Sequence, residues 1–218
     1  MSPNERAAEL LRRLPEIYPD AHCELAFASP LELLVATMLS AQCTDKRVNI
    51  VTKDLFQRCR STRDFADIPL PELERLVHST GFFRNKAKNI RNMAATLLAD
   101  HGGEVPQSLA ELAALPGVGR KTANVVLGNA FGKNEGVVVD THVARLSRRL
   151  GLTKSENPVR IEQDLIRRFP RDRWADLSHW LIFHGRRRCS ARKPDCAGCE
   201  LRDICPSAAK ASPATPAG

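Results

Sequence analysis

Signals that start and stop helices run almost the whole length of this 218-residue chain, and they constrain its fold more than any other feature. A serine followed three residues later by glutamate, the capping-box pattern, occurs at Ser2, Ser29 and Ser108, and proline follows the first two directly. Apolar spacing predicts further helices at 48–59, 71–79, 85–100, 120–130, 141–150, 158–169 and 172–184. Glycines stand where helices are expected to end, at Gly81, Gly102, Gly132, Gly151 and Gly185. The β-branched run 137–139 is too short to found a sheet, so the sequence predicts an all-α fold.

The net charge of +8 is concentrated in the C-terminal part of the chain. Residues 1–132 carry 16 Lys/Arg against 15 Asp/Glu, whereas residues 133–218 carry 17 against 10. Such a surface is suited to a polyanion, and it is equally typical of a solvated basic face that keeps a protein soluble. The apolar runs are too short to span a membrane and the N-terminus lacks the features of a signal peptide. We therefore expect a soluble cytoplasmic protein, associated with the nucleoid if its partner is DNA, and no membrane contact.

The run 115–123, Leu-Pro-Gly-Val-Gly-Arg-Lys-Thr-Ala, joins two predicted helices. Gly117 and Gly119 permit positive φ and a close backbone approach, and they directly precede a helix whose first N–H groups lack partners. A phosphate could be held there by backbone N–H groups and by the positive end of the helix dipole. An ordinary tight turn between helices is the alternative, although the flanking Leu-Pro and Thr-Ala favour the anion site.

Four cysteines near the C-terminus follow the spacing C-x6-C-x2-C-x5-C, at Cys189, Cys196, Cys199 and Cys205. Four soft ligands packed this closely indicate a metal centre rather than disulfides in a cytosolic chain. Four thiolates suit zinc as well as an iron–sulfur cluster, although zinc sites more often show two short C-x-x-C pairs. Spacing alone leaves both metals open.

The run 115–123 resembles the helix-hairpin-helix of DNA repair glycosylases. Four further motifs, 40–45 (SAQCTD), 139–142 (VDTH), 180–185 (WLIFHG) and the cysteine set, occur in the order and spacing of the bacterial endonuclease III family. The resemblance covers residues of about 21–206. It implies two helical domains flanking a cleft: a six-helix barrel domain at 22–132 that carries the hairpin, and an iron–sulfur domain formed by 1–21 with 133–206. It also implies a [4Fe-4S] cluster on the four cysteines.

Lys121 and Asp140 are the residues to which the resemblance assigns catalysis. A lysine amine can attack C1′ of the sugar, displace the base and form a Schiff base. Position in the first turn of a helix, beside Arg120, disfavours an ammonium, and we expect partial burial in the cleft to lower the pKa of Lys121 further. Position alone favours a phosphate contact for Lys121 and is consistent with a helix N-cap for Asp140, and the family pattern is what favours catalysis. An ionised Asp140 could also stabilise positive charge on the sugar.

The resemblance further implies DNA contacts. A base inside a duplex must be extruded before it can be cut out, and Gln42 matches the family residue that fills the vacated space. Phe82 stands where many relatives carry a leucine wedge, and if Phe82 is packed inside, that role falls to Phe83 or to no residue. Phosphate contacts are expected from a hairpin set and from a set around the cysteine loop: Gly117, Val118, Gly119, Arg120 and Thr122; Arg186, Arg192 and Lys193.

The resemblance implies a bifunctional glycosylase and apurinic/apyrimidinic (AP) lyase that removes oxidised or ring-saturated pyrimidines from double-stranded DNA and also cuts at abasic sites, and we expect it to be a monomer. The alternatives are a mismatch-specific adenine glycosylase, disfavoured by Lys121 and by the lack of room for an extra C-terminal domain, and a non-catalytic DNA-binding module. The tail 207–218 has too little apolar surface to bury, and we expect it to be disordered.

Overall fold

A computed structural model describes residues 1–208, and that part of the chain is helical with irregular connections and contains no strand. The predicted all-α fold is confirmed. The β-branched run 137–139 lies in an extended connection before a helix, where the Val138 N–H donates to Ser178 Oγ at 3.0 Å.

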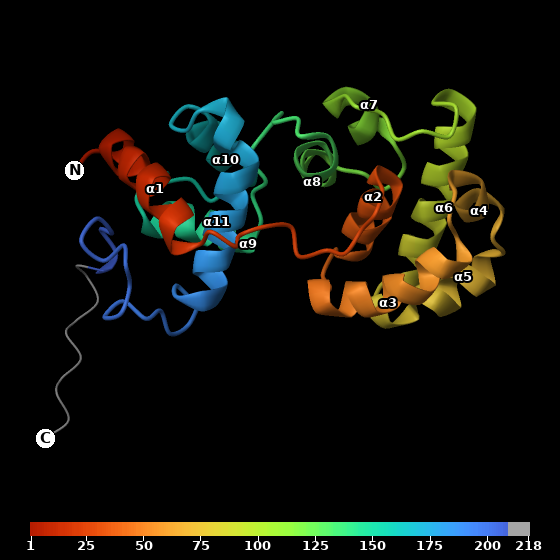
Figure 1. Ribbon diagram of the computed structural model, residues 1–218, viewed down its shortest axis with the longest axis horizontal. Coiled ribbons are helices and arrows are strands. Elements are labelled where there is room, and N and C mark those ends of the chain that lie inside the picture. The colour runs from red at the N-terminus through yellow and green to blue at the C-terminus, as the bar shows by residue number, and fades with distance from the viewer. Residues whose placement is uncertain (209–218) are drawn as a thin grey trace, which may run out of the picture. The chain divides into compact units, whose positions relative to one another are not determined.

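The chain divides into two compact units. Unit 1 is formed by both ends of the chain, Met1–His22 and Gly136–Gly218, and unit 2 by the continuous segment Cys23–Glu135. The helices of unit 1 are α1 (Pro3–Ile17), α9 (Thr141–Arg149), α10 (Pro158–Ile166), the 3-10 turn η2 (Arg171–Arg173) and α11 (Trp174–Arg187) (Figure 1). The helices of unit 2 are α2 (Pro30–Leu39), α3 (Asp45–Arg58), α4 (Thr62–Asp67), α5 (Leu70–Val77), the 3-10 turn η1 (His78–Thr80), α6 (Phe83–Asp100), α7 (Leu109–Ala114) and α8 (Arg120–Phe131).

Unit 2 is organised around α2, whose residues from Leu33 to Leu39 are all buried. Such a helix, apolar on every side, is stable only when other helices surround it. Helices α3, α6 and α8 contact α2, and α6 also packs against α4 and α5. The resulting core includes Leu55, Phe65, Ile90 and Leu127.

The two ends of the chain share the core of unit 1. Leu10 and Leu14 of α1 are fully buried in one cluster with Leu201 and Ile204. The buried Arg6 reinforces this pairing, because its Nε donates to the Ile204 carbonyl at 2.8 Å and its Nη1 to the Gly151 carbonyl at 3.3 Å. Removing either end would expose the other.

The serine caps are confirmed at Ser2, Ser29 and Ser108, each of which accepts the N–H of the glutamate three residues on. The full reciprocal box forms at Ser2. The sequence reading missed α4, which is started by a reciprocal box between Ser61 and Asp64. Aspartate is not the residue that the capping-box pattern specifies.

One other prediction was wrong, and a second began two residues too early. Helix α11 does not stop at Gly185 but continues to Arg187, and Gly185 is buried inside it. A Cβ there would lie 2.8 Å from His142 Nδ1, so this glycine serves close packing rather than helix termination. The tail predicted to be disordered begins with two ordered residues: Ser207 Oγ donates to the Arg149 carbonyl at 2.8 Å, and Ala208 is buried. The remainder, 209–218, lies outside the described residues.

A search of the described residues finds no helix both long and apolar enough to cross a membrane.

Candidate functional site

The run 115–123 forms a hairpin between α7 and α8. Leu115 and Val118 are buried and anchor the turn in the core of unit 2, and the Val118 N–H donates to the Leu115 carbonyl at 3.0 Å. Gly117 has φ +75°, and a Cβ there would lie 2.7 Å from Asn89 Cβ. Gly119 has an ordinary φ of −94°, and nothing lies within 4 Å of its missing Cβ. The two glycines therefore act differently: Gly117 makes the turn, and Gly119 leaves open space in front of the helix.

Helix α8 begins without a side-chain cap, because Gly119 occupies the N-cap position. The first turn of a helix carries unpaired N–H groups and the positive end of the dipole, which together attract an anion. Arg120 and Lys121 are exposed in this first turn, and Thr122 is half-buried. Val118, in contrast, is buried and its N–H is used within the turn, so it presents little to a ligand.

Lys121 projects from the first turn of α8 and is exposed. Its ammonium makes no hydrogen bond or ion pair with any of residues 1–208. Its amine is accessible to a substrate.

Asp140 caps α9, as its position in the sequence suggested. Its Oδ1 accepts the Val143 N–H at 2.7 Å, and the residue is half-buried. Lys121 belongs to unit 2 and Asp140 to unit 1.

Two non-glycine residues in the described chain have a positive φ: Gln42, at +54°, and Phe82, at +48°. Both are exposed, and Phe82 retains 65% of its surface. Side chains other than glycine adopt this conformation at a cost of about 1–3 kcal/mol, and such strain gathers at functional sites. These are the two residues expected to enter the duplex.

Phe83 is not available for that role. It packs against the core of unit 2, its ring centroid lies 4.5 Å from that of His78, and Arg84 lies over its face. Of the two adjacent aromatic residues at the start of α6, Phe82 is the one that projects from the surface.

The four C-terminal cysteines line one small cavity in unit 1. All are half-buried free thiols. Cys189 Sγ accepts from Arg149 Nη1 at 3.2 Å, and Cys199 Sγ lies 3.7 Å from His184 Nε2. Burial raises the pKa of the Cys199 thiol to about 11. Buried thiols that face one cavity, with a guanidinium donor beside them, are suited to ligating a cation as thiolates.

The donor set bears on which metal fits. Four thiols at one cavity suit a single zinc ion or an iron–sulfur cluster, because both take four thiolate ligands.

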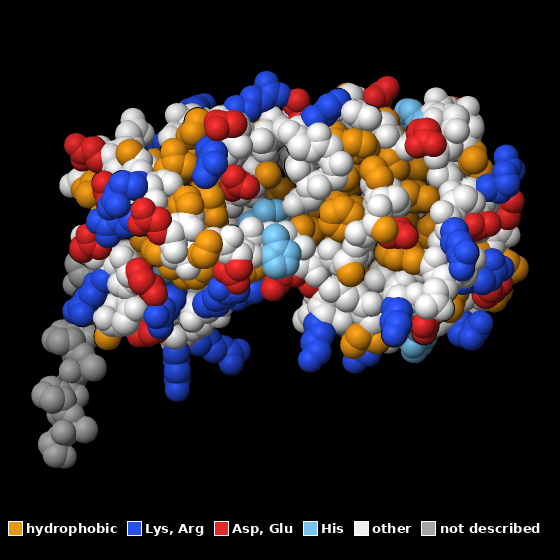
Figure 2. Space-filling model, viewed as in Figure 1, with side chains coloured by type: hydrophobic (Ala, Val, Ile, Leu, Met, Phe, Trp, Pro, Cys, Tyr) orange, Lys and Arg blue, Asp and Glu red, His pale blue; other side chains and the backbone are white. Residues whose placement is uncertain are grey.

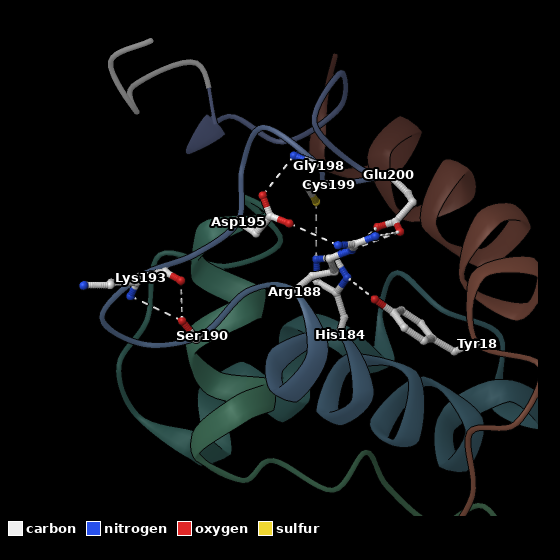
Figure 3. A network of polar contacts seen from close by, with 9 residues as sticks. All are labelled: Tyr18, His184, Arg188, Ser190, Lys193, Asp195, Gly198, Cys199 and Glu200. Atoms are coloured by element: carbon white, nitrogen blue, oxygen red, sulfur yellow. Dashed lines mark hydrogen bonds and ion pairs between the residues drawn. The ribbon is translucent and has the colours of Figure 1, made fainter. Parts of the chain in front are cut away.

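A second group, His184, Cys199 and Glu200, brings its ligand atoms within 4.8 Å of one another. Figure 3 shows that its members already have partners. The Glu200 carboxylate accepts two donors from Arg188, and His184 Nδ1 lies 2.8 Å from Tyr18 Oη. Burial lowers the pKa of His184 to about 4, so this ring is neutral. We interpret the group as a polar network that braces the cysteine loop.

Much of the basic excess of unit 1 is paired. Arg187 forms an ion pair with Asp20, and Arg188 pairs with both Asp195 and Glu200. On the face drawn in Figure 2, acidic and basic side chains interleave over the elements of unit 1. The predicted contacts Arg186, Arg192 and Lys193 are exposed.

Arg192 and Lys193 stand apart from that pairing. Their cationic groups bond to none of residues 1–208, and Lys193 points away from the network in Figure 3. A hydrogen bond from Ser190 Oγ to the Lys193 carbonyl, at 2.6 Å, fixes the backbone beneath them.

Sequence reasoning missed three residues of these sites. Arg149 and Tyr18 lie beside the cysteine loop, and Lys86 is buried in unit 2. Only Lys86 carried a signal, since it falls on the buried stripe of α6 with Ile90 and Met93. A lysine on an apolar stripe is exceptional, because a charge is buried only when it is paired.

Comparisons with known proteins agree with this arrangement. Residues 35–171 match the family model described as HhH-GPD superfamily base excision DNA repair protein. The endonuclease III of Synechocystis sp. is 55% identical over 95% of this chain and 94% of its own, and that of Escherichia coli K12 is 42% identical over 90% and 93%.

Solved structures give the same result. A non-covalent endonuclease III–DNA complex and a trapped endonuclease III–DNA covalent intermediate both superpose with a TM-score of 0.91 at 44% identity. The superpositions cover 96% of this chain and 98% and 99% of those proteins. A thermostable thymine-DNA glycosylase shares the fold, with a TM-score of 0.86 at 21% identity. This chain belongs to the endonuclease III family, within the HhH-GPD superfamily of base excision DNA repair proteins.

Proposed function

We propose that this protein binds damaged double-stranded DNA, removes oxidised or ring-saturated pyrimidines and then cuts the strand at the abasic site through Lys121. The observation that carries the proposal is the accessible amine of Lys121 in the uncapped first turn of α8. In this proposal unit 2 is the barrel domain expected at 22–132, and unit 1 is the iron–sulfur domain expected at 1–21 and 133–206.

Lys121 acts as the nucleophile. Once it has lost its proton, its nitrogen forms a bond to C1′ of the sugar while the N-glycosidic bond breaks, and the base leaves with the bonding electron pair and takes up a proton. The sugar ring opens to give a Schiff base between Nζ and C1′. Loss of a proton from C2′ then expels the 3′ phosphate, which is β-elimination.

Asp140 supplies negative charge. Because the Val143 N–H holds its carboxylate in place, Asp140 can stabilise the positive charge that develops on the sugar as the base departs. This role and the capping role are compatible, since a capping carboxylate has a second oxygen.

The hairpin holds the DNA backbone without reading a base. A phosphate lies in the open space beside Gly119, at the first N–H groups of α8, and the first turn of that helix also carries the exposed Arg120 and Lys121. Thr122 adds a hydroxyl donor. Arg186, Arg192 and Lys193 contact phosphates from unit 1, and the bonds that fix the Ser190–Lys193 turn limit the entropy lost on binding.

Gln42 and Phe82 act on the stacked bases. Gln42 fills the space left by the extruded nucleotide, and Phe82 enters the stack beside the orphaned base. Their exposure and their strained backbone support these roles.

The four cysteines, Cys189, Cys196, Cys199 and Cys205, would hold a [4Fe-4S] cluster. When bound, such a cluster supplies rigidity to the loop and a one-electron redox centre. Arg149 then donates to a cluster thiolate and fixes that ligand from the outside.

Trapping with borohydride tests the proposal, because reduction converts a Schiff base into a stable amine. Incubation with duplex DNA containing thymine glycol, or an abasic site, should give a covalent protein–DNA adduct. Lys121→Gln should give none while DNA binding survives, since one phosphate contact among many changes affinity only modestly. Lys53→Gln, which removes another exposed lysine of unit 2, is the matched control and should trap normally.

Adduct formation by Lys121→Gln would place the nucleophile elsewhere in the chain. If the unmodified protein binds DNA but forms no adduct and does not nick the strand, it is instead a non-catalytic DNA-binding module.

A further inference from the structure

Lys86 is a buried charge that the reaction proposed above does not use. It lies in the first turns of α6, exposes 7% of its surface and sits on the helix face that also buries Ala87 and Ile90. Burial lowers the pKa of this lysine, which reflects the cost of taking an ammonium out of water. A buried ammonium needs compensating hydrogen bonds to be tolerated.

Those hydrogen bonds go to two backbone carbonyls from different segments. Lys86 Nζ donates to the carbonyl of Leu39 at 2.8 Å and to the carbonyl of Thr80 at 2.8 Å. Leu39 is the last residue of α2, and Thr80 is the last residue of η1. A single side chain therefore links the C-terminal ends of α2 and η1, which lie some forty residues apart in sequence.

Each of those ends leads directly into one of the strained residues. Gln42 follows Leu39 by three positions, in a turn closed by the Cys43 N–H donating to the Ser40 carbonyl at 3.0 Å. Phe82 follows Thr80 by two positions, and the Phe82 carbonyl accepts the N–H of Lys86 itself at 3.1 Å. Both left-handed non-glycine residues of the described chain thus adjoin a bond to Lys86.

We infer that Lys86 is a positioning residue for base extrusion, which holds the Gln42 turn and the Phe82 turn in a fixed mutual geometry. The inference rests on the proposed roles of Gln42 and Phe82. Strained conformations persist only where the surroundings over-determine them, and a buried ammonium with two directed donors supplies such a constraint. Without it, each turn can relax toward an ordinary φ and re-aim its side chain.

The alternative is that Lys86 only stabilises the fold by satisfying the last carbonyl of α2. The two readings differ in what they predict for duplex and single-stranded substrates. Extrusion costs free energy only where the damaged base is stacked and paired. A positioning role therefore affects duplex substrates selectively, whereas a purely structural role affects both substrates alike.

The experiment compares Lys86→Met, Lys86→Arg and the control Lys53→Met on the same damaged base in duplex and in single-stranded DNA, below the unfolding temperature of every variant. Lys86→Met should lose about tenfold or more in base release from duplex, because the lost extrusion assistance is of the order of a kcal/mol or more. It should change single-strand release by no more than about twofold, the size expected for a substitution away from the reacting atoms. Lys86→Arg, which keeps the charge and the donors, should recover part of the duplex rate, and Lys53→Met should be unchanged.

A double-variant cycle tests the coupling itself. Gln42→Ala should show the same selective duplex loss, and Gln42→Ala combined with Lys86→Met should be little worse than either alone, because both remove one function. Equal losses on both substrates, or losses that add in the double variant, would overturn the inference. If Gln42→Ala loses duplex activity selectively and Lys86→Met does not, the inference fails while the proposed function stands. If neither shows selectivity, the proposed role of Gln42 fails with it.

Should Lys86→Met unfold at the assay temperature, Lys86→Gln replaces it. Its shorter side chain keeps two N–H donors but cannot reach both carbonyls. The duplex-to-single-strand ratio is again the readout, and an unchanged ratio refutes the inference.

Discussion

Substitutions at Asp140 separate its two roles, since capping and charge respond to different changes. Asp140→Asn removes the charge but keeps an oxygen that can accept the Val143 N–H. Because Asn caps a helix about as well as Asp, the melting temperature should change by no more than about 2 °C. Asp140→Ala removes both and should lose about 1 kcal/mol of unfolding free energy, which lowers the melting temperature by about 2–4 °C. Base release should fall equally in both variants, by about 10²–10³-fold, if the charge stabilises the sugar cation.

A matched cap in the same unit supplies the control. Asn157 begins α10, and its Oδ1 accepts the N–H groups of Val159 and Arg160 at 2.9 and 3.3 Å. Asn157→Ala should therefore destabilise the protein as Asp140→Ala does, with full activity. Single-turnover base release and thermal unfolding of all three variants are the measurements. The electrostatic role would be refuted if the rate of base release fell in step with the melting temperature across the three variants, so that Asp140→Asn was nearly as active as the unmodified protein.

Three further predictions follow from the geometry of the hairpin, the wedge and the cysteine loop. Gly119→Ala should fold normally but bind DNA more weakly, because its Cβ would occupy the open space that a phosphate approaches. Gly117→Ala should lose more than about 1 kcal/mol of stability in thermal unfolding, because this residue has a positive φ and its Cβ would clash with Asn89. Equal DNA affinity of Gly119→Ala and the unmodified protein would contradict the prediction. Phe82→Ala should leave the melting temperature unchanged and slow base release from duplex, and Phe83→Ala should do the opposite, since only Phe83 is packed against the core. Purified protein should be yellow-brown and contain about four iron atoms per chain by elemental analysis, and stoichiometric zinc with no colour would disprove the iron–sulfur assignment.

Local chemistry predicted most of this fold. Proline after a serine cap and glutamate three residues on identified the starts of α1 and α2, because these signals act within one turn of helix. The misreadings arose where a residue has a second use. Gly185 resembles a helix terminator, but it admits His142 to a close contact, a reason that lies in another helix.

The candidate site was predictable in composition and not in conformation. The positions of Lys121, Asp140 and the cysteines are readable as motifs. The left-handed backbone of Gln42 and Phe82 is not, because neither residue type favours it and the bonds beside them come from Lys86. The exposure of Lys121 likewise depends on what surrounds α8 in space.

The discontinuity of unit 1 has a consequence for biosynthesis. Unit 2 is one unbroken segment, so it can fold while the ribosome is still translating the rest of the chain. Helix α1 emerges first, yet its apolar face packs against α11 and against Leu201 and Ile204, so it lacks these partners until α11 and the residues after it have been made. The first helix to be synthesised is therefore among the last to have its apolar face buried. A nascent chain stalled before α11 has been made should present α1 to chaperones and proteases, whereas Cys23–Glu135 should already resist digestion.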